Sequence, residues 1–349
     1  MCSVRWLLLL AACVGGSGCF STGYLLQAAG GQYELLHLAR PLNVVKEDAS
    51  VPPGVRALLA KVPAIKRFGQ LNGLTPTDNY TRYADLHRPA AVWVVQGCKS
   101  LTFEPRRWSF PIVGSVPYLG YFAEDRARAF ARELAAQEPD LDITVRTASA
   151  YSTLGWFKDP VLSTMIPEGP ESFAELANVI LHESVHATVY VKNQSAFDES
   201  LASFIADELT WLLVVGRSGL SSDEARSWIA GEERGARFVK ALHQAYEELD
   251  AIYRSARSDE EKRSLKEARL GELQRSLGLR RRYNNADLAG YRTYDTGGVA
   301  FARLRKACGG LPKFLAAVRS LRETDFTSPQ QQQFDDVVDA LAARECQGK

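Results

Sequence analysis

The 349-residue sequence has almost no net charge, only five histidines and no long apolar run beyond its first residues. Its 42 lysines and arginines nearly cancel its 41 aspartates and glutamates, which leaves a formal charge of +1. This balance argues against a nucleic-acid partner, because dedicated nucleic-acid binders carry an excess of positive charge. The lack of long apolar runs argues against a transmembrane mature chain, since a spanning helix needs about 20 apolar residues. No repeat or coiled-coil pattern is present, so an ordinary globular protein is expected.

The first eighteen residues have the layout of a secretory signal. Arg5 precedes an apolar run over residues 6–14, and glycine and serine follow. Gly16-Ser17-Gly18-Cys19 resembles a bacterial lipoprotein cleavage site, after which Cys19 would carry the lipid and become the new N-terminus. Leu10-Ala11-Ala12-Cys13 fits the local pattern better but leaves a very short apolar region. Cys19 is therefore preferred and Cys13 is the alternative; an ordinary signal peptide with an incidental cysteine is the third interpretation.

Lipidation predicts a mature chain anchored in a bacterial cell envelope through its N-terminal lipid. Phe20 follows Cys19, where lipoproteins retained at the inner membrane commonly have aspartate. We therefore expect the outer membrane, with the protein facing the periplasm.

Cysteine is scarce in the rest of the chain, and no C-x-x-C pair occurs, so cysteine-based zinc or redox chemistry has no support. After Cys19, only Cys98, Cys308 and Cys346 remain. Three cysteines allow at most one internal disulfide. Cys308 and Cys346 are the expected pair, because both lie in the C-terminal segment and the cell envelope is oxidising.

Strand patterns come early in the chain and helical patterns late. Residues 91–95, 108–116 and 142–145 are rich in β-branched and apolar side chains, which favours strands. Apolar residues recur at helical spacing over 124–137. Further helices are predicted over 55–68, from about 170, and as two or more surface helices within 222–282. The chain is thus predicted to be α+β and mainly helical.

Two of the histidines fall in Leu181-His182-Glu183-Ser184-Val185-His186, an H-E-x-x-H motif within an apolar helical pattern. Residues four apart on a helix share a face, about 5–6 Å apart at Cβ, so both imidazoles can reach one tetrahedral zinc ion. Glu183 stands beside the metal, where it can accept a proton from a zinc-bound water. The alternative is a structural helix whose histidines only bond their neighbours.

A catalytic zinc of this type needs a third protein ligand and one open position. A polar turn follows His186, and Ser195-Ala196-Phe197-Asp198 has the form of a capping box, with Asp in the place of Glu or Gln, that would begin a second helix. A hairpin of two helices would bring Glu199 back beside the histidines, which makes it the best third ligand. Asp207 and Glu208 are rivals, but they lie roughly 12 Å farther along the helix axis. Asp207 shares a face with Glu199, so a hydrogen bond to a ligand histidine is a possible role.

The sequence resembles a bacterial family of predicted zinc aminopeptidases that carry H-E-x-x-H and occur as envelope lipoproteins. The resemblance covers most of the mature chain, and the most distinctive block runs from Ala150 to Phe157, with Asp159-Pro160 after it. Its other blocks are Gly18-Cys19, Gln27 to Gln32, Tyr83 to Leu86, Arg88-Pro89, Phe110 to Gly114, Gly120 to Phe122, the metal motif, Phe197 to Ser200 and Tyr283 to Ala286. The family is similar to gluzincin peptidases, which implies His182, His186 and Glu199 as ligands of one Zn²⁺ per chain, with Glu183 as base.

Two departures from the family are visible. Asp198 stands where members tend to have Asn, and Ser109 and Ser115 stand where members often have cysteines, so a disulfide there is not expected. The amino-terminus-binding G-x-M-E-N motif of well-known zinc aminopeptidases is missing, so peptidase activity is better supported than exopeptidase activity.

Tyr151, upstream of the metal motif, is a candidate to stabilise the tetrahedral oxyanion. Asn284 and Asn285 either line the site or cap a helix that starts at Ala286, since Asn is a favoured cap.

The sequence as a whole predicts a gluzincin-like zinc metallopeptidase of peptide substrates. Its expected divisions are a signal peptide over 1–18, a lipid-anchored linker and first helix over 19–50, and a metallopeptidase domain over 51–349. That domain is expected to be strand-bearing over about 51–165 and helical and zinc-binding over about 166–349. The alternatives are a non-catalytic envelope lipoprotein that keeps the helix pair as scaffold, and a zinc hydrolase of non-peptide amides.

Overall fold

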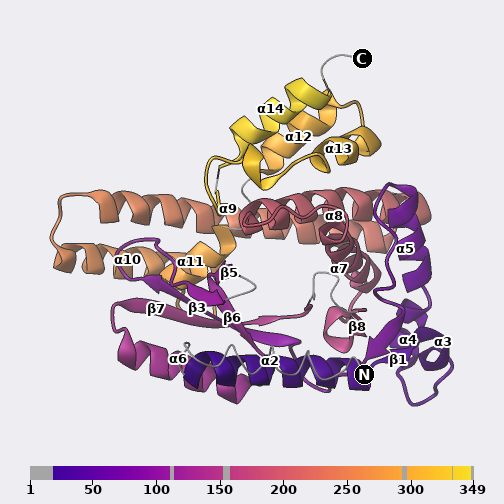
Figure 1. Ribbon diagram of the computed structural model, residues 1–349, viewed down its shortest axis with the longest axis horizontal. Helices are drawn as coiled ribbons and strands as arrows, with labels where there is room; N and C mark the ends of the chain where they lie inside the picture. Colours follow the sequence, from indigo (N-terminus) through magenta and orange to yellow (C-terminus); the bar gives the residue numbers. More distant parts are fainter. Residues whose placement is uncertain (1–18, 111–113, 152–157, 293–296, 332, 347–349) are drawn as a thin grey trace, which may run out of the picture.

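The computed structural model describes residues 19–110, 114–151, 158–292, 297–331 and 333–346, which fold into stacked layers of helices around small sheets (Figure 1). Helices make up 59% of the structure. This agrees with the α+β, mainly helical class predicted from the sequence. Among the helices of these described ranges, none has both the length and the apolarity needed to cross a bilayer.

The central sheet has three antiparallel strands in the order β6-β3-β7. Strand β3 (Val92–Lys99) lies between β6 (Tyr118–Tyr121) and β7 (Leu141–Ala148). Strand β7 contains the pattern predicted at 142–145, and β3 covers all but the first residue of the pattern predicted at 91–95; both strands extend beyond their patterns. Two smaller sheets complete the strands: β1 (Arg40–Pro41), β2 (Arg82–Ala84) and β8 (Val161–Leu162) in one, and β4 (Trp108–Phe110) with β5 (Gly114–Val116) in the other.

The segment 108–116, expected to be one strand, forms the two strands of an antiparallel ladder. Residues 111–113 between these two strands lie outside the described residues. Ser109 pairs directly with Ser115 in this ladder. Cysteines at these two positions, as in the family that the sequence resembles, would therefore face each other across neighbouring strands.

Helices α6 (Glu124–Gln137) and α2 (Cys19–Leu38) lie along one side of the central sheet (Figure 1). Helix α6 has the bounds predicted from its helical spacing, with Ala127 and Leu134 buried against the strands. Helix α2 is tied to β6 by polar contacts: Gln27 Nε2 donates to the carbonyl oxygen of Gly120 at 2.9 Å. Within the range 19–50, expected to hold a linker and a first helix, residues 19–38 therefore form one long helix that docks on the sheet.

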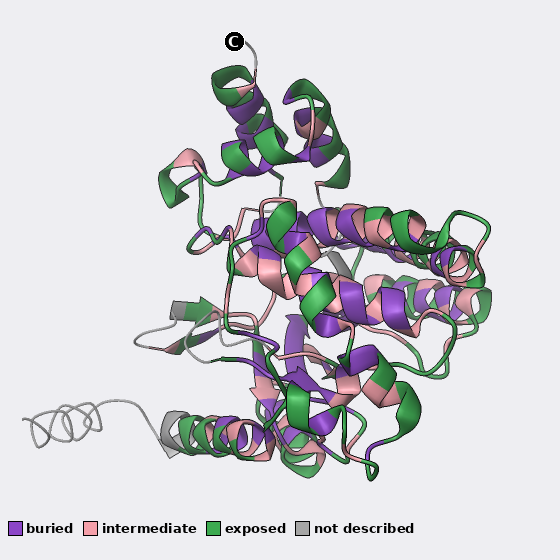
Figure 2. Ribbon diagram, turned by 90° about the vertical axis from the view of Figure 1, so that its right-hand side faces the viewer, coloured by how far each residue is buried: buried purple, intermediate pink, exposed green. Residues whose placement is uncertain are grey.

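The other side of the sheet faces four long helices: α7 (Ser172–His186), α8 (Ser195–Ser218), α9 (Asp223–Arg254) and α10 (Asp259–Leu277). Figure 2 shows their buried residues turned inward and their exposed residues outward. The last two are the surface helices expected within 222–282. Ser222 caps α9, while Ser258 and Glu261 form a capping box at the start of α10.

Helix α11 (Asn285–Arg292) joins the sheet to the α9–α10 hairpin through buried polar contacts. Asn285 is fully buried, and its amide donates to the carbonyl oxygens of Lys99, Ser100 and Thr102 at 2.9 to 3.1 Å. Asn284 Oδ1 accepts from Asp287 N at 3.2 Å, which is the capping role weighed from the sequence. The Tyr283 to Ala286 block is therefore structural at both asparagines.

The chain ends in a group of three helices, α12 (Gly298–Ala307), α13 (Leu311–Val318) and α14 (Asp335–Glu345). Their aromatic core packs on α8: the rings of Phe301 and Phe334 contact Phe197. A disulfide joins Cys308 to Cys346, as expected, while Cys98 is buried and free.

The other helical segments of the described residues are short. They are α3 (Leu42–Val45), α4 (Pro53–Leu59), α5 (Val62–Leu71) and the 3₁₀ turns Ser163–Met165 and Glu323–Asp325.

The single helix expected over 55–68 is thus wrong, because the chain forms α4 and α5 instead. Pro63 lies in the first turn of α5. Proline lacks the amide hydrogen that a continuous helix would need there, but it is well suited to begin a helix.

Candidate metal centre

Helix α7 places the two motif histidines one turn apart on the same face. Leu181 and Val185, their neighbours in sequence, are almost completely buried in the core. The apolar side of α7 therefore fixes the rotation of the helix and turns His182 and His186 toward α8. This arrangement follows from helical periodicity alone, which is why the sequence predicts it.

A short connection returns the chain from α7 to α8. Asp198 Oδ1 accepts from the backbone N–H of Val191 at 2.9 Å, and Asn193 adopts a left-handed φ of 61° in between. The capping box expected over Ser195 to Asp198 is wrong: α8 begins at Ser195 without a side-chain cap. Asp198 fastens the connection instead, so Glu199 lies one turn into α8.

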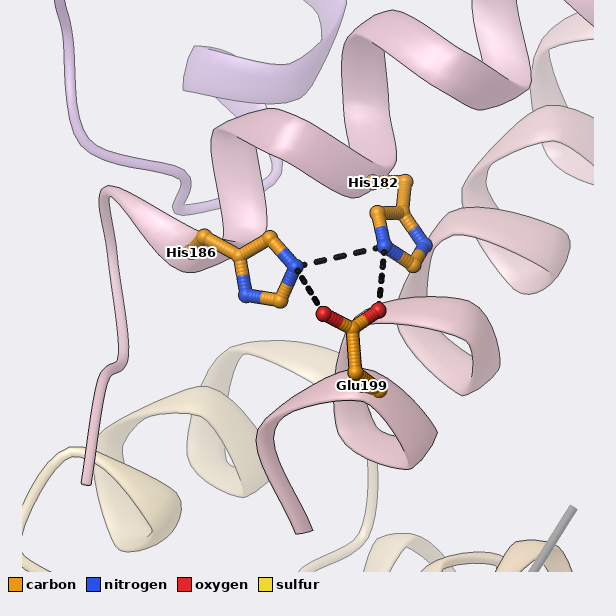
Figure 3. A group of neighbouring side chains, drawn as sticks. All are labelled: His182, His186 and Glu199. Atoms are coloured by element: carbon orange, nitrogen blue, oxygen red, sulfur yellow. Dashed lines mark hydrogen bonds and ion pairs between the residues drawn. The ribbon is translucent and has the colours of Figure 1, made fainter. Parts of the chain in front are cut away.

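His182, His186 and Glu199 converge on one point between the two helices (Figure 3). The two Nε2 atoms are 3.2 Å apart, and the Glu199 carboxylate oxygens lie 3.4 Å from His182 Nε2 and 3.7 Å from His186 Nε2. Tetrahedral zinc, with bonds of about 2.1 Å, separates its ligand atoms by about 3.4 Å. The triad thus has the spacing and the donor atoms of a metal site, and two imidazole nitrogens with a carboxylate suit a divalent cation.

The charge states of His186 and Glu199 also suit a cation. Burial and the neighbouring His182 lower the pKa of His186 to about 4, against the opposing charge of Glu199. Burial works to raise the pKa of Glu199, but its hydrogen bond with His182 and the nearby imidazoles lower it overall. At neutral pH His186 is therefore neutral and Glu199 ionised, which are the forms that bind metals.

The pKa of His182 moves in the opposite direction. Burial works to lower it, but the hydrogen bond with Glu199 and the charges of Glu183, Glu199 and Asp207 raise it. This imidazole thus stands in a strongly negative environment. Its side chain is 17% exposed and that of Glu199 is 28% exposed, so the centre is sheltered but not sealed.

Glu183 follows His182 on α7, close enough for its charge to act on both His182 and Tyr80. Tyr80 is buried, and this burial, together with the charges of Glu183 and Asp159, holds the pKa of its phenol well above the usual range. Its backbone has a left-handed φ of 60°, and its N–H donates to the Asp159 carbonyl oxygen at 2.7 Å. Sequence reasoning missed Tyr80, because only the packing of distant segments brings it to Glu183.

The two rival carboxylates have other partners. Asp207 Oδ1 accepts from Asn178 Nδ2 at 2.8 Å, so Asp207 is held by α7 one turn before His182. Glu208 Oε1 and Oε2 accept from Arg305 Nε at 2.5 and 2.6 Å, which ties α8 to α12. The structure therefore brings Glu199 to the histidines and leaves Glu208 in a structural ion pair.

Arg146 supplies a positive charge from the strand-bearing half. It lies on β7 opposite Val94, on the sheet face whose Val92 and Val94 belong to the core shared with the helices. Arg146 Nε donates to Gln96 Oε1 at 3.0 Å, and its charge helps to lower the pKa of Glu199. No local pattern in the sequence pointed to this arginine.

Tyr151 packs into the main core, and its ring contacts Phe122 edge to face at 5.1 Å between centroids. Burial raises the pKa of its phenol. Among the described residues, no hydrogen bond or ring contact joins Tyr151 to the triad. The block that follows it, 152–157, lies outside the described residues, so the oxyanion role stays a prediction.

The chain matches the family model described as "Putative aminopeptidase" over residues 23–333. It belongs to this family. Membership supports a peptidase activity and a peptide substrate, and it extends from α2 to the connection before α14. No curated protein and no solved structure matches the chain.

Proposed function

We propose that the protein is a zinc-dependent peptidase, an aminopeptidase in the sense of its family, with one zinc ion per chain. The observation that carries this proposal is the convergence of His182, His186 and Glu199 beside Glu183. A structural helix pair needs no such set, because three metal-binding side chains facing one point lose solvation without gaining an apolar contact.

The residues present divide the work of peptide hydrolysis. His182, His186 and Glu199 would hold the zinc ion, which supplies polarisation of the scissile carbonyl and lowers the pKa of an attacking water. Glu183 would accept the proton of that water and pass it to the leaving amine. The buried Tyr80 is close enough to feel the charge of Glu183. Tyr151 remains a candidate oxyanion donor.

The charge around the centre favours a substrate with a free amino group. Glu183, Glu199 and Asp207 all act on His182 with negative charge, whereas Arg146 acts on Glu199 with the opposite sign. A substrate's α-ammonium would be attracted to this region, whereas an acidic peptide would be repelled. This supports aminopeptidase activity over cleavage within a chain.

The test compares hydrolysis of aminoacyl amides, free peptides and N-acetylated peptides by the mature protein, before and after chelation and after zinc is restored. We expect zinc-dependent hydrolysis of substrates with a free amino terminus. Glu183→Gln should keep zinc but lose about 10²–10⁴ in rate, because the amide cannot accept the proton. The matched control is Glu168→Gln, an exposed carboxylate before α7, which should behave as wild type.

Each other outcome decides against part of the proposal. A variant Glu183→Gln with near-normal turnover excludes Glu183 as the base. Hydrolysis of N-acetylated peptides at equal rates indicates an endopeptidase, and turnover of non-peptide amides alone indicates the amide hydrolase. A protein that binds no zinc and cleaves none of these substrates is the scaffold alternative.

We further propose that Cys19 is lipidated and anchors the protein to the outer membrane, facing the periplasm. The support is the signal-like segment before Cys19. The helix that follows the proposed anchor is docked on the sheet, so lipid and domain would be rigidly connected.

A further inference from the structure

Helix α2 presents an uncharged outer face. Its side chains Leu25, Leu26 and Tyr33 are 52%, 69% and 69% exposed, and Ala29 and Gly30 are exposed as well. At about 100° per residue these five positions fall within one arc of the helix. The sequence has no Asp, Glu, Lys or Arg between Cys19 and Tyr33. Such a face is unusual for a helix that borders only water, where charged residues dominate the exposed side.

The opposite face holds α2 firmly on the domain. Leu35 is buried in the main core, and Gln27 bridges β6 by donating to the Gly120 carbonyl oxygen and accepting from the Phe122 N–H. Gly31 lies against the Phe122 ring so closely that a β-carbon would overlap it. The exposed arc therefore cannot turn inward without breaking these contacts.

The distance of this exposed face from Cys19, the proposed lipidation site, indicates which surface would cover it. Cys19 is the first residue of α2, and Leu26 lies seven residues later, roughly 10 Å along the axis at 1.5 Å per residue. An acyl anchor on Cys19 would hold the first turns of α2 at the level of the lipid headgroups. Leucine and tyrosine on an uncharged helix face are the side chains that enter this interface.

A groove beside α2 adds a polar edge to the same surface. It has a volume of about 690 Å³ and is lined by Leu26 and Gly30 of α2 together with Arg88 and Arg126. Arg88 is paired with Glu34 through Nη1 at 2.9 Å, whereas Arg126 is exposed. An arginine at the rim of an apolar face matches the phosphate groups of a lipid surface.

We propose that the outer face of α2, formed by Leu25, Leu26, Ala29, Gly30 and Tyr33, lies on the bilayer that the lipid anchor reaches. This inference rests on the proposed lipidation of Cys19. In Figure 1 α2 and the helices α7 and α8 lie on opposite sides of the central sheet. The metal centre would then face away from the membrane, open to substrates in the periplasm.

The test uses the full acylated protein in vesicles of phosphatidylethanolamine and phosphatidylglycerol, with and without a nitroxide on the acyl chains. Leu26→Cys and Tyr33→Cys are each labelled with a fluorophore; the native Cys98 is buried and the other two cysteines are in the disulfide, so labelling is selective. The control is Leu71→Cys on α5, which is 74% exposed. We expect strong nitroxide quenching at positions 26 and 33 and none at 71.

Vesicle flotation and mass spectrometry of Cys19 are measured on the same samples. If the protein is acylated and floats with the vesicles but positions 26 and 33 are not quenched, the α2 proposal is overturned and the anchor stands. Energy transfer between labelled copies without quenching would show that a second copy covers the face, which also overturns it. A protein that is neither acylated nor vesicle-bound overturns the anchor and the α2 proposal together.

Discussion

At the residue scale, Asp198 is a buried carboxyl whose oxygen Oδ1 holds the connection before α8. Burial raises its pKa to about 8. Because this value lies above the usual value near 4, the folded protein keeps a proton that the unfolded chain releases. The free energy of unfolding should therefore fall as pH rises from about 4 to about 8, which is the opposite of the usual behaviour of an ion-paired aspartate.

Asp198→Asn should remove this loss of stability, because asparagine offers the same acceptor to Val191 and does not titrate. We expect the variant to match wild type at pH near 4 and to exceed it by about 1–3 kcal/mol near pH 8. Denaturant unfolding of chelator-treated protein across this range measures the difference. The exposed Asp336→Asn on α14 is the control, and its difference from wild type should stay the same across this pH range. A constant difference between Asp198→Asn and wild type at every pH would contradict the assigned protonation.

Glu199 is the proposed ligand whose position takes a longer argument from the sequence than the positions of the histidines. The spacing of His182 and His186 fixes their common face through helical geometry alone. Glu199 requires in addition that the chain reverse after His186, and the polar residues of the turn predicted that reversal. The predicted capping box was wrong, since Asp198 accepts a hydrogen bond within the turn and does not cap α8. The Glu199 side chain nevertheless lies beside the two histidines, as predicted.

Glu199→Gln should weaken zinc binding by more than about 100-fold, because losing a direct ligand exceeds the 10–100-fold effect of losing an outer partner. Glu208→Gln is the matched control on the same helix. It should keep zinc affinity, since Glu208 pairs with Arg305 and not with the histidines. Zinc competition with a chromophoric chelator measures both affinities. Loss of zinc in Glu208→Gln with retention in Glu199→Gln would reverse the ligand assignment.

At the scale of elements, the sequence predicted best those helices whose signals are local. The bounds of α6 follow from its apolar spacing and the acidic residues of its first turn. Residues 55–68 were misjudged because their apolar pattern outweighed the proline within them, and 108–116 because a strand pattern does not reveal a hairpin. The sheet order β6-β3-β7 could not be predicted, since it depends on pairing between segments far apart in the sequence.

Helix α11 depends on the buried amide of Asn285, for which the sequence left a capping role and a role in the site open. Asn285 donates to three carbonyl oxygens, while its Oδ1 accepts from Tyr253 and its backbone N–H donates to Asp142. Asp142 is also paired with the buried Lys266 at 2.5 Å. One side chain thus links the sheet, the α9–α10 hairpin and α11.

Asn285→Ala should lower the free energy of unfolding by about 2–4 kcal/mol, because it removes the hydrogen bonds to three carbonyl oxygens and leaves the buried Tyr253 hydroxyl without its acceptor. Asn43→Ala, at an exposed position of α3, should change stability by less than about 0.5 kcal/mol. Urea unfolding of both variants gives the comparison. A near-zero effect of Asn285→Ala would show that water replaces these hydrogen bonds.

At the scale of the whole molecule, the candidate site is made by two halves that the sequence describes separately. The helical half contributes the triad and Glu183, whereas the strand-bearing half contributes Arg146 and, through the segment before β2, Tyr80. Neither Arg146 nor Tyr80 belongs to a recognisable sequence motif, because each comes close to the site only when the sheet packs against α7 and α8. The proposed chemistry was therefore predictable from the residues of α7 and α8, but its surroundings were not.

The last prediction concerns where the whole molecule resides. Membrane fractionation of wild type, Cys19→Ser and Cys13→Ser should show that only Cys19→Ser is released. A single acyl chain binds a membrane only marginally, and three chains on Cys19 would bind it much more tightly. Release of the wild-type protein from the membrane should therefore be slow. If Cys19→Ser stays bound and acylated while Cys13→Ser becomes soluble, then Cys13 is the lipidated residue. If both single variants stay bound, the double variant decides: a soluble double variant shows that either cysteine accepts the lipid, and a bound one shows that neither is the anchor.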